Sequence, residues 1–78
     1  MEKFVTLRLP LTDVFQIIDG LTERMIIWKA TEEIMVTGYS HFGDCMEECS
    51  DPEEARFIAE YYEKIIDLIN KQLENQKL

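Results

Sequence analysis

SDPEEARFIAEYYEKIIDLIN, residues 50–70, combines a strong helix-start signal with the apolar spacing of a long amphipathic helix. Asp51 can cap the first backbone N–H groups, and Pro52 suits the first helical position because it has no N–H to leave unpaired. Glu54 lies three residues after this cap and can reach back to it, as in a capping box. We therefore predict a helix over residues 51–75.

The apolar side chains of this helix define the surface that it must bury. A start one residue earlier, with Ser50 as the cap and Glu53 reaching back, is also compatible with the sequence. In either register, eight side chains fall within one arc of roughly 120°, the width of a core-facing stripe. They are Ala55, Ile58, Ala59, Tyr62, Ile65, Ile66, Ile69 and Leu73. The rest of the chain must supply a surface that covers this stripe.

Residues 3–9 alternate in the manner of a short strand. One face carries Phe4, Thr6 and Arg8, and the other carries Val5, Leu7 and Leu9. Pro10 ends the pattern because proline has no N–H to donate to a ladder. The sequence contains no convincing second strand. We expect this segment either to pair with its copy in another subunit or to pack extended along the helices.

A second long helix is predicted over residues 11–37, with Thr12 as its cap and Asp13 in its first turn. Its first half has one apolar face, formed by Leu11, Val14, Phe15, Ile18, Leu21 and Met25. Gly20 is either tolerated, or marks a kink or a close approach by another helix; a break at Asp19-Gly20 is the minor alternative. Gly38 is a good stop, because a helix often ends in a left-handed residue.

The second half of this helix is apolar around most of its circumference. Residues 25–28 are four consecutive large apolar residues, and residues 34–36 repeat the pattern. A helix of this kind must be buried on more than one side. We therefore predict one mainly α-helical domain, residues 1–78, in which a strand precedes an antiparallel helical hairpin, and which assembles as a homo-oligomer.

Particular side chains are predicted to hold that oligomer together. They lie off the main stripes, in rows spaced by four and seven residues, and are Phe57, Tyr61, Leu68, Ile27 and Ile34. Two helices cannot bury both of their rows against each other in one hairpin. Exposed apolar patches of this size usually mark an interface, so we expect a dimer or a higher oligomer.

The net charge of the chain limits the classes of partner that it is expected to bind. The chain has 8 basic and 16 acidic residues, a net charge of -8. Direct binding to nucleic acid or to an anionic membrane is therefore not expected, because both require a basic surface. A basic protein surface is compatible with this charge, as is a simple role in solubility. No signal peptide or membrane span is apparent, and the two cysteines form no disulfide framework, which predicts a cytoplasmic protein.

The acidity is concentrated in the predicted loop, residues 38–50, and beside it. Eight acids and no Lys or Arg lie between Ala30 and Ala55. The candidate binding surface consists of Glu32, Glu33, Asp44, Glu47, Glu48, Glu53 and Glu54. Because neighbouring like charges favour protonation, we expect raised carboxyl pKa values here and greater stability on mild acidification.

Metal and catalytic sites are not predicted. His41, Cys45 and Cys49 are spaced by four and four, so that a helical turn would align them for zinc, with Asp44 or Glu48 as a fourth ligand. Structural zinc sites usually bring two separated pairs instead. His41 and Cys45 also lack the third group that would orient a base beside a nucleophile. The expectation is a non-enzymatic protein without a cofactor.

A nucleotide pocket is an alternative use of the aromatic and basic side chains. Arg24, Trp28, Tyr39, Arg56, Tyr61 and Tyr62 could meet where the helices or two subunits cross. Aromatic rings stack on bases, and arginines clamp phosphates. The same residues also serve as ordinary core and interface aromatics, which is the interpretation that we favour.

The chain resembles short phage and prophage accessory proteins. The resemblance rests on DPEEARFIAEYYEKII, residues 51–66, preceded by a strand and by a long helix that ends in Gly38-Tyr39. It implies antagonists of bacterial defence, such as anti-CRISPR proteins, and sponges for signalling nucleotides. The expected function is to block a host protein with the acidic surface. A nucleotide sponge and a structural module of a larger assembly are the alternatives.

Overall fold

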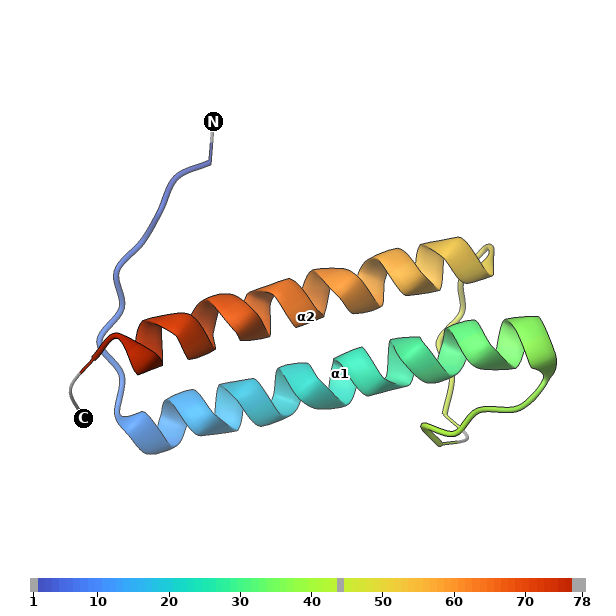
Figure 1. Ribbon diagram of the computed structural model, residues 1–78, viewed down its shortest axis with the longest axis horizontal. Helices are drawn as coiled ribbons and strands as arrows, with labels where there is room; N and C mark the ends of the chain where they lie inside the picture. The colour runs from blue at the N-terminus through green and yellow to red at the C-terminus, as the bar shows by residue number, and fades with distance from the viewer. Residues whose placement is uncertain (1, 44, 77–78) are drawn as a thin grey trace.

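Two antiparallel helices form the whole regular structure of the computed structural model, which describes residues 2–43 and 45–76. Helix α1 spans Leu11–Thr37 and helix α2 spans Pro52–Glu74. They lie side by side as a hairpin, with the start of α1 and the end of α2 at the same end of the molecule (Figure 1). The prediction of a mainly helical hairpin is confirmed.

The start of α2 follows the local chemistry of its sequence. Asp51 is the extended cap residue, and its Oδ1 accepts the Glu54 N–H at 2.8 Å. Pro52 occupies the first turn. The Glu54 carboxylate reaches back, but it accepts the N–H of Ser50, at 3.1 Å, rather than that of the cap. One orphan donor of the first helical turn and one donor just before the helix are thereby satisfied.

The start of α1 differs from the prediction, because Thr12 is not its cap. Pro10 has that position, and its carbonyl accepts the N–H groups of Asp13 and Val14 at 3.0 and 3.1 Å. The helix therefore begins at Leu11, and Thr12 lies inside its first turn. At the other end Gly38 adopts the expected left-handed conformation, with φ of 80°, and donates its N–H to the carbonyl of Ile34.

Gly20 lies within the continuous helix α1, so the chain does not break at this position. A Cβ built at Gly20 would meet no atom within 4 Å among the described residues. The close approach of another helix therefore does not occur at Gly20 within the single chain.

The hairpin core is made of small side chains. Ala30 and Thr31 of α1, together with Ala55 and Ala59 of α2, are buried. The other six side chains of the predicted α2 stripe are half-buried, so the stripe faces α1 as expected. On the predicted face of α1, in contrast, Leu11 and Phe15 remain exposed. A single hairpin thus buries little of its large apolar surface.

The predicted strand over residues 3–9 is absent from the described structure. The segment runs from the start of α1 past the end of α2 (Figure 1). A strand is defined by its hydrogen-bonded partner, and the described chain provides no second extended segment beside it. The alternation is retained only in part: Val5, Leu7 and Leu9 line a groove on the hairpin and Phe4 and Thr6 do not, but Arg8, from the other predicted face, lines it as well.

Candidate functional site

The connection between the helices, residues 38–51, is the candidate site, and we call it the strap. It leaves the end of α1, doubles back beside that helix and then crosses to the start of α2 (Figure 1). A helical turn in its second half, which would have aligned His41, Cys45 and Cys49 on one face, is absent, since residues 45–49 form no helix.

Hydrogen bonds to α1 hold the strap in place. The His41 N–H donates to Glu33 Oε2 at 2.8 Å, and the Glu47 N–H donates to Thr31 Oγ1 at 2.9 Å. The Thr31 hydroxyl in turn donates to the carbonyl of Ile27 at 2.8 Å. Because Thr31 is completely buried, the strap covers the small-residue core at this end of the hairpin. Thr31 could not be identified as an anchor from the sequence, because its partner lies 16 residues away.

Sulfur and aromatic contacts add to this attachment. The Cys49 thiol donates to the Met35 thioether, with 3.2 Å between the sulfur atoms. Lys29 Nζ lies 5.8 Å from the centre of the Phe42 ring, within the range of a cation–π contact. Cys45 is an exposed free thiol. Among the described residues, no group of three or more His, Cys, Asp or Glu side chains is arranged to hold a metal ion.

The pKa of Glu33 differs from the raised value that was expected for the clustered acids. The backbone N–H of His41 donates to its carboxylate, and this bond to the charged form lowers the pKa of Glu33 below its ordinary value. The expected rise is therefore wrong for Glu33. The expectation failed because it considered only the charges along the sequence. It did not include the backbone N–H groups that the folded loop directs at a carboxylate.

We expect Glu33→Gln to lower the melting temperature at pH 7, because glutamine accepts the same N–H without a charge. The folded-state pKa of Glu33 is depressed, so its stabilisation is present above the unfolded value of about 4.5 and is lost as the pH falls through the folded value. The difference between the wild type and Glu33→Gln should accordingly shrink between pH 5 and pH 3 in thermal melts.

The control for this experiment is Glu48→Gln, a substitution of an exposed acid for which no hydrogen bond is described. It should leave the melting temperature close to that of the wild type at each pH. A difference for Glu33→Gln that stays constant down to pH 3 would contradict the assignment of the stabilisation to the Glu33 charge.

The predicted acidic surface divides into two groups. Glu32 and Glu33 are half-buried, because Glu32 pairs with Arg56 and Glu33 holds the strap. The exposed members are Glu47, Glu48, Glu53 and Glu54, and Asp44 lies outside the described residues. The Glu32 contact raises the pKa of Arg56. The one arginine of this region is therefore already occupied by an acid.

Net charge is confined to this end of the hairpin. Residues 32–60 contain nine of the 16 acids and one of the 8 bases, a net charge of -8. The remaining seven acids are balanced by seven bases. Three large apolar side chains of the strap are exposed among the acids, namely Tyr39, Phe42 and Met46. We call residues 32–60 the acidic end.

The six residues of the predicted nucleotide pocket are not gathered in one hollow. Arg56 pairs with Glu32, and the rings of Tyr61 and Tyr62 stack with 6.1 Å between their centres. Arg24 and Tyr39 are exposed, while Trp28 is half-buried. Of the six, only Tyr61 lines a described hollow, a shallow one that it shares with Phe57, Glu60 and Lys64.

The predicted interface residues are exposed on α2 but partly covered on α1. On α2, Phe57, Tyr61 and Leu68 are 72%, 55% and 58% exposed, as expected for a row that faces away from α1. Ile27 and Ile34 are half-buried, so the second row of α1 is partly covered within the single chain.

No protein-family model, curated protein or solved structure matches this chain. Within residues 2–43 and 45–76, neither helix has a stretch that is long and apolar enough to cross a membrane.

Proposed function

We propose that this chain is a non-enzymatic binding protein that docks its acidic end on a basic surface of another protein. The observation that carries the proposal is the confinement of the net charge of -8 to residues 32–60. The exposed Tyr39, Phe42 and Met46 of the strap are a second support. Aromatic residues and methionine are enriched at protein interfaces, whereas a surface that serves only solubility has no need of them.

The chemistry of the acidic end suits a protein partner better than a nucleic acid. A phosphate backbone would be repelled by the acids, whereas a basic groove would be attracted and steered into register. The hydrogen bonds that the strap donates to Thr31 and Glu33 hold it in place before a partner arrives. A pre-organised loop loses less conformational entropy on binding, which favours affinity.

The resemblance to phage accessory proteins narrows the proposed partner. We propose a component of a bacterial defence system, in the cytoplasm of the host cell, whose nucleic-acid groove the acidic end would occupy. A nucleotide sponge has less support, because only Tyr61 of its six candidate residues lines either of the two hollows described. A structural module of a larger assembly is the third alternative, and no particular contact favours it.

The test uses a panel of purified bacterial defence nucleases and measures their binding to labelled DNA by fluorescence anisotropy. We expect the wild type to displace the DNA from at least one nuclease, and the competition to weaken as salt rises. The variant Glu47→Gln/Glu48→Gln/Glu53→Gln should compete roughly tenfold less well, because complementary charge speeds encounter by about that factor or more.

The matched control is Glu63→Gln/Asp67→Asn/Glu74→Gln, which removes three exposed acids from the other end of α2. It changes the net charge by the same amount and should compete like the wild type. Equal losses for both triple variants would contradict a localised acidic site. A melting temperature raised by cyclic dinucleotides or by ADP-ribose, without competition for any nuclease, would favour the sponge.

A further inference from the structure

The half of the hairpin that contains the chain ends is poorly buried. All five buried residues, Ala30, Thr31, Ser40, Ala55 and Ala59, lie within residues 30–59. None of the described residues 2–29 and 60–76 is buried. We call residues 2–29 and 61–76 the terminal half. Outside residues 32–60 the chain's seven acids and seven bases cancel, so this half is also close to neutral.

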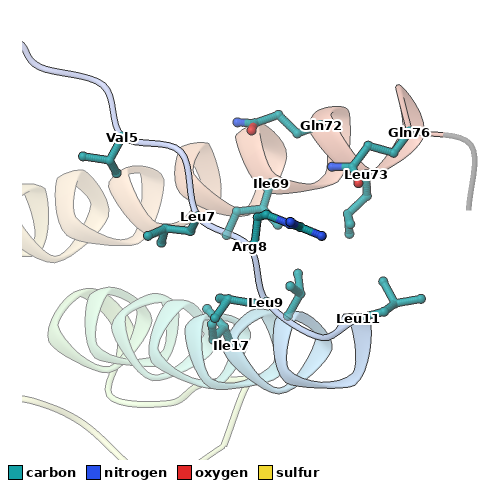
Figure 2. A pocket seen from close by; sticks show the side chains of 11 residues that line it. Val5, Leu7, Arg8, Leu9, Leu11, Ile17, Ile69, Gln72, Leu73 and Gln76 are labelled. Atoms are coloured by element: carbon teal, nitrogen blue, oxygen red, sulfur yellow. The ribbon is translucent and has the colours of Figure 1, made fainter.

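A groove of about 460 Å³, lined mostly by apolar side chains but also by Arg8, Gln72 and Gln76, lies in the terminal half, between the N-terminal segment and both helices (Figure 2). Its apolar walls include Val5, Leu7 and Leu9 of the segment, Ile17 of α1, and Ile69 and Leu73 of α2. Val5 and Leu7 line the groove and yet remain 81% and 73% exposed. The segment therefore contributes a wall to the groove without closing it.

The backbone of the same segment has no hydrogen-bond partner within residues 2–43 and 45–76. The described hydrogen bonds include none from a backbone group of residues 2–9. An extended segment with alternating apolar side chains and free N–H and C=O groups is a template for another strand. The groove and the free backbone edge thus occur together at one end of the molecule.

We propose that a second copy of this chain covers the terminal half, with residues 3–9 of the two copies paired as an antiparallel ribbon across a two-fold axis. If one residue of the segment lies opposite its own copy at the two-fold axis, Val5, Leu7 and Leu9 of both copies lie on the same face of the ribbon. This face then covers the grooves. Thr6 is the midpoint of the segment. A register centred there places Val5 opposite Leu7, and Phe4 opposite Arg8.

Charge favours a second copy as the occupant. Two acidic ends would repel each other, but the neutral terminal halves do not. Pairing through the terminal halves brings the uncharged surfaces together and leaves the acidic ends at opposite extremes of the dimer. Each acidic end then stays free for a partner, so the arrangement is independent of what that partner is.

Sedimentation velocity of the full chain tests the proposal. At about 50 μM and moderate salt, the wild type should sediment with twice the chain mass of 9.2 kDa. Leu7→Glu should yield the single-chain mass with its helical circular dichroism retained, because Leu7 is exposed in the isolated hairpin. Val36→Glu is the matched control, an exposed apolar residue of the acidic end, and should remain dimeric.

Cysteine cross-linking tests the strand pairing without disturbing the fold. In a Cys45→Ser/Cys49→Ser background, Thr6→Cys should form a disulfide-linked dimer under mild oxidation, because facing residues of antiparallel strands lie within disulfide reach. Thr12→Cys, exposed on α1, is the control. A single-chain mass for the wild type, a dimeric Leu7→Glu, or equal cross-linking of Thr6→Cys and Thr12→Cys would each overturn the proposal.

Discussion

Thr31→Val should lower the free energy of unfolding by about 1 kcal/mol, the net contribution of a typical hydrogen bond. The Thr31 hydroxyl accepts the Glu47 N–H at 2.9 Å and is completely buried. Valine has nearly the same shape but no oxygen, so the strap would lose one of its hydrogen bonds to α1. A loss of this size corresponds to a fall in melting temperature of at least about 4 °C for a domain of this length.

Thr22→Val is the matched control. The Thr22 hydroxyl donates to the carbonyl of Ile18 at 2.8 Å, in the same way that Thr31 bonds to Ile27. No described donor from the strap bonds to Thr22, so its replacement should change the free energy of unfolding by less than about 0.5 kcal/mol. Equal effects of the two substitutions, measured in urea melts, would show that the Glu47 bond contributes nothing to stability.

The same pair of variants connects the strap to the proposed function. If the acidic end binds as a pre-organised surface, Thr31→Val should also weaken competition with DNA for a defence nuclease, measured below its melting temperature. Thr22→Val should not. A Thr31→Val variant that competes normally would indicate that the acids act through their charge alone, without a fixed strap.

The elements that sequence analysis predicted well are those determined by local chemistry. The Asp51 cap and Pro52 mark the start of α2 within a few residues, and the 3.6-residue spacing identifies its inner face. All eight residues of the predicted stripe are buried or half-buried. Gly38 ends α1 because only a left-handed residue completes the bonds at that point.

The predictions that failed depend on partners elsewhere in the chain. The strap is not helical, and the N–H groups of His41 and Glu47 bond to the Glu33 and Thr31 side chains of α1 instead of to carbonyls one turn earlier. Thr12 is a favourable cap residue, but the carbonyl of Pro10 already accepts the first helical N–H groups. The alternation at residues 3–9 is compatible with a strand, but it does not specify the partner strand that a sheet requires.

Tyr61→Glu combined with Leu68→Glu should convert the proposed oligomer into a single chain or leave it unfolded. Both side chains are more than half exposed on the face of α2 that points away from the core. Both also lie in the terminal half, where the chain's charges cancel and a second copy is not repelled. Burying a large apolar side chain contributes about 1.5–3 kcal/mol, which a small-residue core cannot replace.

Phe57→Glu is the control that tells whether association depends on Tyr61 and Leu68 or is lost when any exposed apolar side chain of α2 is replaced by a charge. Phe57 is more exposed than either residue of the double variant, at 72%, but it belongs to the acidic end. If the two copies meet through their terminal halves, Phe57→Glu should keep the mass of the wild type in sedimentation, while Tyr61→Glu/Leu68→Glu should not. A double variant with unchanged mass and melting temperature would remove this row from the interface. Loss of association in Phe57→Glu would instead move the junction toward the acidic end.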